Sequence, residues 1–350
     1  MTSNSFCRHL SNGFRIFIKN GRVTWLPCCY WQGEELAFDH LQTRRSAINI
    51  STPWHHQECA RCGNEEVYKT PNSYREVSHR IIPKMDQQKA GWIDIQADIT
   101  CNGGCLICGP WNSSFWQTEL ARYKEWSIVP VERDLKTLVD SVFAQVDVSE
   151  LRLLQFLGGE PFLSDVDQWA MAHIEHPEQC VLKYTTNGSV YPQSDRLDSW
   201  RRFKEVQINL SIDGIGAKFE YLRYPLQWNR VESHIQRYLN EREINFSFHI
   251  NHTLTPLNIW YYDEFIAWVN ATFPATRFRG IHAHTAYGVM SVAATSQRVR
   301  DMVLGRYGSN HMLTQMLAAN PLTANDFWPW IEKWDQRRGT AWTRVFKEIV

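Results

Sequence analysis

After residue 90 the chain alternates short apolar segments, typical of buried strands, with longer amphipathic segments, typical of helices. The expected strands are Trp92–Asp98, Leu151–Leu157, Val181–Thr186, Glu205–Ile212, Asn245–Leu254 and Arg277–His284. The helices expected between them include Ser113–Glu125, Leu135–Gln145, Asp165–Glu175, Ser194–Lys204, Val231–Arg242 and Trp260–Ala271. This alternation predicts the α/β class with a parallel sheet. Six βα units are fewer than a closed eight-stranded barrel needs, so we expect a partial (β/α)6 barrel, TIM-like and open on one side.

The segments before and after this barrel differ from it in composition and in predicted structure. We expect a small cysteine-rich domain over residues 1–85, the barrel over residues 86–290 and a helical segment packed on it over residues 291–350. Asn20-Gly21 is a strong hairpin signal in the first segment. The aromatic cluster of the last segment has helical spacing and is expected to pack rather than to stack on a ligand; it comprises Phe327, Trp328, Trp330, Ile331 and Trp334.

Composition narrows the classes of protein to which the chain can belong. Of 350 residues, 43% are hydrophobic, which is too many for a disordered chain, and no apolar run approaches the roughly 18 residues of a spanning helix. The N-terminus lacks the apolar stretch of a secretory signal, so we expect a cytoplasmic protein with reduced thiols and no membrane partner. Lys and Arg (37) balance Asp and Glu (37), which makes a nucleic-acid partner unlikely.

The nine cysteines are the main chemical signal, because thiols in a reducing compartment usually serve metal binding or catalysis. Cys101, Cys105 and Cys108 form a CxxxCxxC directly after the first barrel strand, and Gly103-Gly104 lets this loop curl so that three thiolates converge. Three thiolates suit a [4Fe–4S] cluster with one open iron, whereas a structural zinc needs a fourth ligand from elsewhere. Both interpretations stay open at this point, the cluster being the better fit.

A second cysteine group lies in the N-terminal segment. Cys59 and Cys62 form a CxxC, and together with Cys7 and one of the adjacent pair Cys28/Cys29 they make four thiolate ligands. Four thiolates fit zinc and an iron–sulfur cluster equally well. His55 and His56 are close enough to compete but are more often solvated beside a CxxC. Cys180 opens a strand at the end remote from the expected site and is interpreted as a buried, inert thiol.

The ends of the first four barrel strands all carry distinctive residues. They end in the cysteine triplet, in FLGGEPFL, in TTNGS and in LSIDG. Any one of these is explained by a turn, but four at corresponding strand ends are typical of an active site at the C-terminal face of a barrel.

Together these motifs resemble the radical S-adenosylmethionine (SAM) enzymes, whose hallmark is CxxxCxxC after the first barrel strand. Gly158-Gly159-Glu160-Pro161 is similar to the GGEP element of that family, and Ser211 with Asp213 is similar to its fourth-strand motif. The N-terminal cysteines and the KWDQRRGT segment further resemble the subgroup with a twitch domain, a SPASM-like auxiliary-cluster region. Two features depart from the family pattern: Ile107 replaces a common aromatic residue, and no glycine-rich fifth-strand motif is visible.

The resemblance implies a [4Fe–4S] cluster on Cys101, Cys105 and Cys108 whose open iron chelates SAM, and reductive cleavage of SAM to methionine and a 5′-deoxyadenosyl radical that abstracts hydrogen from a substrate. It favours a second [4Fe–4S] cluster over zinc on Cys7, Cys28, Cys59 and Cys62, with Cys29 as the alternative to Cys28. The residues that it implies in cofactor binding are Ile107, Gly158, Gly159, Glu160, Pro161, Asn187, Ser211, Asp213, Arg223 and Asn251.

The substrate follows only from the subgroup. Its members often act on peptides, so we expect modification of a peptide side chain or backbone by cross-linking, oxidation or epimerisation, with flavodoxin or ferredoxin as an electron donor. A small molecule, sugar or nucleotide is the alternative substrate, and a non-catalytic iron–sulfur or zinc module is a minor one. His282 and His284 share one face of the last strand and are interpreted first as structural and second as proton-transfer residues.

Overall fold

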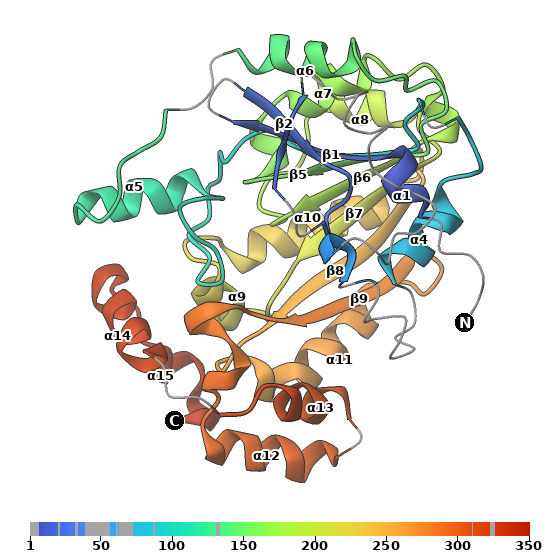
Figure 1. The fold of residues 1–350 in the computed structure, drawn as a ribbon. Helices are drawn as coiled ribbons and strands as arrows, with labels where there is room; N and C mark the ends of the chain where they lie inside the picture. Colours follow the sequence, from blue (N-terminus) through green and yellow to red (C-terminus); the bar gives the residue numbers. More distant parts are fainter. Residues whose placement is uncertain are drawn as a thin grey trace.

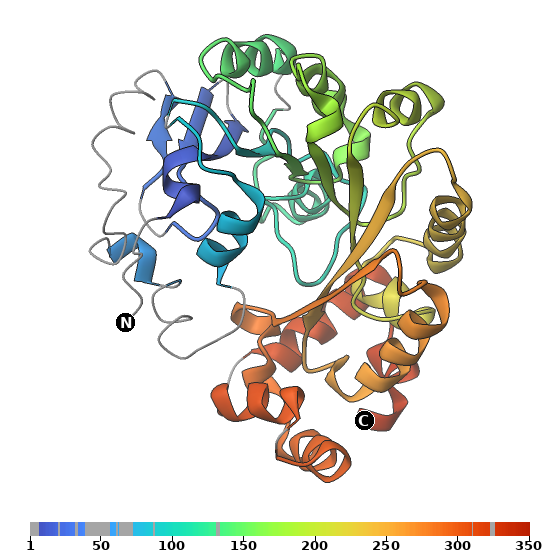
Figure 2. The ribbon, with the colours of Figure 1, turned by 90° about the vertical axis from the view of Figure 1, so that its right-hand side faces the viewer.

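The fold is a curved sheet covered on its outer face by helices (Figures 1 and 2). The computed structural model describes residues 7–19, 22–31, 34–38, 57–60, 62, 73–86, 88–130, 134–309, 311–322 and 326–350. Within these residues the nine strands form one sheet in the order β3-β2-β1-β4-β5-β6-β7-β8-β9. None of the helices there combines the length and the apolar character that a membrane crossing requires.

The six barrel strands expected from the sequence are confirmed to within two residues at each end. They are β4 (Trp92–Gln96), β5 (Leu153–Leu157), β6 (Val181–Thr186), β7 (Glu205–Ser211), β8 (Phe246–Leu254) and β9 (Phe278–Thr285). Each pairs in parallel with the next along the chain. The α/β class and the parallel sheet are therefore confirmed.

Helices follow most of these strands. They are α5 (Ser114–Arg122), α6 (Leu135–Phe143), α7 (Val166–Met171), α8 (Ser194–Trp200), α9 (Ala217–Leu222), α10 (Trp228–Asn240) and α11 (Tyr262–Thr272). Six of them match the expected helices, and α9 is the addition. Apolar side chains of the strands and helices form one continuous core between the two layers.

The N-terminal segment extends the same sheet. The strands β1 (Gly13–Lys19) and β2 (Arg22–Leu26) pair antiparallel, and the short β3 (Leu36–Ala37) pairs with β2. Asn20 and Gly21, which carry the predicted hairpin signal, lie outside the described residues. β1 also pairs in parallel with β4, with Arg15 opposite Asp94. This neighbourhood was not anticipated, because the pairing partner lies far away along the chain. In the described part of this segment the α-helices are α1 (Arg8–Asn12) and α4 (Tyr74–Ile81).

The C-terminal segment is helical and packs on the barrel. It consists of α12 (Gln297–Tyr307), α13 (Met312–Ala319), α14 (Phe327–Arg338) and α15 (Trp342–Val345). Phe327, Ile331 and Trp334 are buried, and Trp328 and Trp330 are partly buried against the same core. The interpretation of this aromatic cluster as packing is confirmed. Cys180 is also fully buried, as expected.

Candidate functional site

The cysteine loop after β4 is held in a tight curve by backbone hydrogen bonds to the region of α9. The amide of Gly104 donates to the carbonyl of Tyr224 at 2.6 Å, and that of Leu106 donates to Leu222 at 2.8 Å. A Cβ atom on Gly104 would lie 2.7 Å from the Phe115 ring and 2.9 Å from Arg338. Only glycine therefore fits where this loop passes between α5 and α14.

The two glycines after β5 pack directly on the backbone that leads into Cys101. A Cβ atom on Gly159 would lie 2.2 Å from the carbonyl oxygen of Thr100, and one on Gly158, whose φ is +134°, would lie 2.5 Å from that of Asp98. The amide of Glu160 also donates to Thr100 at 2.8 Å. The GGEP element is thus joined to the cysteine loop through backbone contacts that no other residue type permits.

Glu160 connects this element to the end of β6. Its carboxylate accepts hydrogen bonds from the Thr186 hydroxyl at 2.7 Å and from the Asn187 amide at 2.8 Å. The side chain is 1% exposed, and burial raises the pKa of Glu160 to about 7. Pro161 follows at the start of a short 3-10 helix. In this arrangement Glu160 ties two strand ends together, and its predicted contact with a cofactor stays a prediction.

Asn187 brings the end of β6 to the cysteine loop. Its amide nitrogen lies 4.0 Å from the Cys101 sulfur and donates to Asn102 at 3.0 Å, while Asn102 donates to Ser189 at 2.8 Å. The sequence pattern drew attention to Asn187 but not to Asn102 or Ser189. The structure therefore brings the ends of β4, β5 and β6 together around Cys101.

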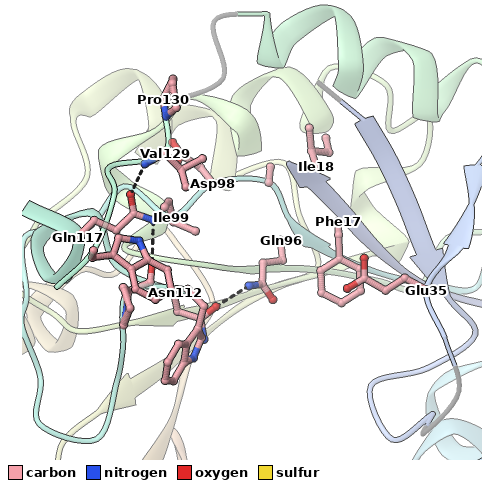
Figure 3. A pocket seen from close by; sticks show the side chains of 14 residues that line it. Phe17, Ile18, Glu35, Gln96, Asp98, Ile99, Asn112, Gln117, Val129 and Pro130 are labelled. Carbon is pink, nitrogen blue, oxygen red and sulfur yellow. Dashed lines mark hydrogen bonds between the residues drawn. The ribbon is translucent and has the colours of Figure 1, made fainter. Parts of the chain in front are cut away.

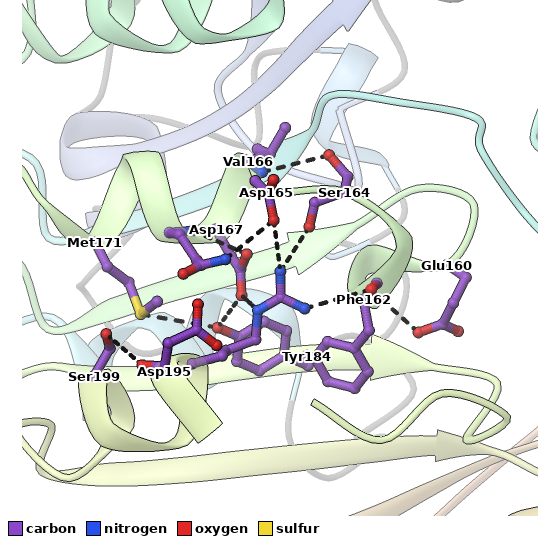
Figure 4. Close-up of polar contacts among 12 residues, drawn as sticks. Glu160, Phe162, Ser164, Asp165, Val166, Asp167, Met171, Tyr184, Asp195 and Ser199 are labelled. Carbon is purple, nitrogen blue, oxygen red and sulfur yellow. Dashed lines mark hydrogen bonds and ion pairs between the residues drawn. The ribbon is translucent and has the colours of Figure 1, made fainter. Parts of the chain in front are cut away.

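A buried network behind β6 supports the GGEP element (Figure 4). Arg196 of α8 donates to the Ser164 carbonyl at 2.8 Å, and its Nε lies 3.1 Å from the carboxylate of Asp167. Asp167 accepts a further hydrogen bond from the Tyr184 hydroxyl at 2.9 Å, and that hydroxyl accepts one from Trp200. Sequence reasoning missed this network, since no local pattern links its members.

The three thiols of the triplet lie within electrostatic reach of one another. Burial and the neighbouring Cys105 raise the pKa of Cys101 to about 12, and the same two causes raise that of Cys108 to about 11. Burial also raises the pKa of Cys105, which the Arg223 cation opposes. Thiols in such surroundings become thiolates when a metal centre replaces their protons. Ile107 is partly buried against the core beside them.

Arg223 and Asp213 form an ion pair directly behind the triplet. Their nearest atoms are 2.6 Å apart, both side chains are buried, and the Arg223 guanidinium also lies 3.8 Å from the Cys105 sulfur. The other Asp213 oxygen accepts the Thr253 amide at 2.8 Å. Here Arg223 faces Cys105 rather than open solvent, and the predicted roles of both residues toward SAM stay predictions. Ser211 and Asn251 are partly buried partners in register on β7 and β8.

A second arginine, Arg338 of α14, was not anticipated at this site. It forms a bidentate pair with Glu119 of α5, at 2.9 and 2.5 Å, and its guanidinium lies over the Trp116, Tyr224 and Trp334 rings. Because it also lies against Gly104, the C-terminal segment contributes directly to the support of the cysteine loop. The sequence signal for this contact was limited to the KWDQRRGT segment.

The N-terminal cysteines form a second, separate group. Cys7, Cys28 and Cys62 are buried and Cys59 is partly buried. Burial raises the pKa of Cys28, and the nearby charges of Cys29, Cys7 and Cys62 raise it further. The surroundings of Cys29 differ, because Asp94 and Tyr74 act on it. Cys28 therefore lies within electrostatic reach of Cys7 and Cys62, and the preference for Cys28 over Cys29 as a ligand stays a prediction. His55 and His56 lie outside the described residues.

Among the residues described, no three Cys, His, Asp or Glu side chains gather closely enough to hold one metal ion. The donors on the cysteine loop are the thiols of Cys101, Cys105 and Cys108, and thiolates are ligands of iron–sulfur clusters as well as of zinc. The predicted choice of a cluster over zinc stays a prediction at both cysteine groups.

Two cavities flank the exposed Trp111 beside this site. One has a volume of about 430 Å³ and is lined by residues that include Phe17, Gln96 and Asn112, whose side chains point toward one another in Figure 3. The other, of about 600 Å³, extends from Cys108 to His284 and α14. Both share Pro110 and Trp111. His284 hydrogen-bonds Thr253 at 3.1 Å, which agrees with its first interpretation as a structural residue, and its ring lies 5.2 Å from that of His282.

Comparisons with known proteins give similarities to solved structures only. No family model matches the chain, and no curated protein matches it. Native anSMEcpe with bound AdoMet is similar with a TM-score of 0.42 and 15% identity, over 67% of this chain and 63% of that one. SuiB of Streptococcus suis bound to S-adenosylmethionine is similar with a TM-score of 0.41 and 13% identity, over 78% and 58%. The chain therefore spans less than two thirds of the length of these proteins.

Proposed function

We propose that the protein is a radical SAM enzyme that modifies a peptide. The observation that carries the proposal is the convergence of three strand ends on the CxxxCxxC loop, with Gly158 and Gly159 seated against Asp98 and Thr100 at distances that no side chain allows. A turn or a zinc knuckle requires none of these contacts. Residues that would hold a [4Fe–4S] cluster are Cys101, Cys105 and Cys108, and Cys7, Cys28, Cys59 and Cys62 would hold a second one.

A [4Fe–4S] cluster held by Cys101, Cys105 and Cys108 would supply one electron to SAM, which would then be cleaved to methionine and a 5′-deoxyadenosyl radical. The residues around the triplet would bind SAM and stabilise the charges at this site. Gly158 and Gly159 let the strand end lie against the backbone that leads into the triplet, and their carbonyls would accept hydrogen bonds from the SAM ammonium. The Arg223 cation offsets negative charge at Cys105, and Asp213 holds that cation in place. A protein electron donor such as flavodoxin or ferredoxin completes the reaction.

The cavity of about 600 Å³ beside Cys108 supports a peptide as substrate. Its rim carries Trp111 and Tyr287, which are 66% and 83% exposed. Exposed aromatic side chains next to a hollow are typical of a surface that binds another chain. A peptide lying there would present its side chains to the cysteine loop.

Anaerobic reconstitution tests the proposal. The wild-type protein should bind about eight irons, as two [4Fe–4S] clusters do, and form 5′-deoxyadenosine from SAM after reduction. Cys105→Ala should lose about half of the iron and all SAM cleavage, whereas Cys180→Ala, a buried cysteine outside both groups, should keep them. SAM cleavage by Cys105→Ala would refute the assignment of the triplet. About four irons in the wild type would refute the second cluster.

A further inference from the structure

The inner face of the sheet is polar, unlike the lumen of an ordinary α/β barrel. Such lumens are filled by layers of branched aliphatic side chains. Here one row across four neighbouring strands consists of Asp94, Gln155, Lys183 and Gln207, which are successive partners in register. The next row begins with Gln96 and its partner Leu157 and includes Thr185, Asn209 and His249, so that it is polar at all of these positions but one. Polar groups in these positions need polar partners, from the chain or from a bound molecule.

Strand β6 shows which side chains reach this lumen. Leu182, Tyr184 and Thr186 are fully buried in contact with the outer layer, whereas Val181, Lys183 and Thr185 between them are partly exposed. Because successive side chains of a strand point to opposite faces, the partly exposed ones face the concave inner side. Lys183 therefore faces the lumen and is partly accessible to solvent there.

Lys183 is a cation for which the described residues provide no partner in this lumen. Its ammonium group makes no hydrogen bond and no ion pair within the described part of the chain, although Asp94 lies two strands away in the same row. Asp94 is fully buried and accepts a hydrogen bond from Trp92 at 2.6 Å. Burial lowers the pKa of Lys183, and the charges of Asp94 and Cys29 oppose that shift. A bound anion would favour its charged form in the same way.

Of the neighbours of Lys183, Arg15 adds a second positive charge to this region, whereas His249 is neutral. Arg15 of β1 faces the same side, with its guanidinium 5.3 Å from the Phe17 ring and 3.3 Å from the Gln96 amide oxygen. Burial and the charge of Lys183 lower the pKa of His249 to about 4, so this ring is neutral and can donate or accept a hydrogen bond. Lys183 is thus the group best placed to receive a negative charge.

The distance along β6 between Lys183 and the cysteine loop limits how short a substrate can be if it is to reach both. It precedes Asn187, which touches the cysteine loop, by four residues, or roughly 13 Å along the strand. A group bound to Lys183 is therefore separated by several bonds from an atom that reacts at the cysteine loop. A single free amino acid is too short to span this distance, whereas a peptide segment is long enough.

We infer that Lys183 anchors a carboxylate of the substrate, and that the substrate is a peptide whose carboxylate lies several bonds from the reacting C–H group. The inference rests on the proposed function and defines its substrate class. The carboxylate has two sources, an acidic side chain or the C-terminus of the peptide, and both offer the same chemistry to an ammonium group.

Peptide retention tests the inference without relying on turnover. The test uses four pools of short synthetic peptides. Each pool carries either Asp/Glu or Asn/Gln at varied positions and has either a free or an amidated C-terminus. The pools are dialysed against reconstituted protein, and the retained peptides are quantified by mass spectrometry. We expect wild type to retain carboxylate-bearing pools at least tenfold better than the pool with amides at both places. Preference for the Asp/Glu pools identifies a side chain, and preference for the free-terminus pools identifies the C-terminus.

Lys183→Met should abolish this preference, Lys183→Arg should keep part of it, and Lys136→Met, which removes the same charge from the outer helix α6, should leave it intact. Equal retention of all pools, retention of none, or an unchanged preference in Lys183→Met would overturn the inference. SAM cleavage measured on the same samples distinguishes a failure of the proposed function from a failure of the inference about Lys183. 5′-Deoxyadenosine formation without carboxylate preference leaves the proposed function standing and removes only this inference.

Discussion

The polar side chains on the two faces of strand β6 differ in burial and in hydrogen bonding. On the outer face, the Tyr184 hydroxyl and the Thr186 hydroxyl are buried and hydrogen-bonded to Asp167 and Glu160. On the inner face, Lys183 is partly exposed and has no partner in the described residues. A satisfied buried network stabilises one arrangement of the chain, whereas an open cation weakens the fold slightly and leaves a place for a ligand. The outer face of β6 therefore stabilises the candidate site, whereas the inner face is available to bind a ligand.

Loss of the arginine behind β6 should have the largest effect on stability. Arg196→Met leaves the carboxylate of Asp167, which is 1% exposed, without its ion-pair partner. Breaking a buried pair in this way costs about 3–5 kcal/mol in the free energy of unfolding. Urea denaturation checks this value. Arg201→Met, at a solvent-accessible pair with Glu243 on the same side, should lose less than about 1 kcal/mol, and equal losses in both variants would contradict the distinction.

Glu160 should make the free energy of unfolding depend on pH. Its pKa is raised by burial from the ordinary value of 4.5 to about 7. The folded protein therefore holds this proton more tightly than the unfolded chain, so the stabilisation is complete below the ordinary value and is lost as pH rises through about 7. Glu160→Gln carries no such proton. Its free energy of unfolding relative to wild type should rise by on the order of 2 kcal/mol between about pH 5 and about pH 8.

Thermal unfolding across this pH range measures the effect. The matched control is Glu243→Gln, at an exposed carboxylate on the surface, and the difference between this variant and wild type should not change with pH over the same range. A constant difference between Glu160→Gln and wild type would show that Glu160 is not protonated more readily in the folded protein.

Lys183 should have the smallest effect on stability. Lys183→Met removes a cation whose pKa burial lowers, so the variant should be equal to wild type or more stable by less than about 0.5 kcal/mol. Urea denaturation without substrate provides the measurement. A loss comparable to that of Arg196→Met would mean that Lys183 has a structural partner, and the two faces of β6 would then no longer differ.

Much of the barrel could be predicted because its signals are local. The six parallel strands follow from apolar segments of five to nine residues, and the helices between them from their own periodicity. The cysteine triplet is contiguous, so its position at the end of β4 required no knowledge of distant contacts. The pairing of β1 with β4 was not predictable, because the hydrogen bonds of a ladder leave no trace in the sequence of either strand.

The support of the candidate site escaped prediction for the same reason. Arg338 lies against Gly104 from more than two hundred positions away, and Arg196 reaches Ser164 and Asp167 from a different helix. Arg223 drew attention in the sequence, but its ion pair with Asp213 and its approach to Cys105 depend on how α9 packs beneath the cysteine loop. Long-range contacts between polar side chains carry no periodicity that could reveal them.

The sequence by itself determined the order of the strands and helices after residue 90 and the strand ends at which the thiols and glycines lie, because these depend on neighbouring residues along the chain. Only the tertiary structure decided which polar side chains are paired and which remain open. The residues of β6 alternate between two faces in any case, but the faces become different only when the sheet curves and helices cover one of them. Packing thus makes Tyr184 part of a buried network and leaves Lys183, its neighbour, facing the lumen.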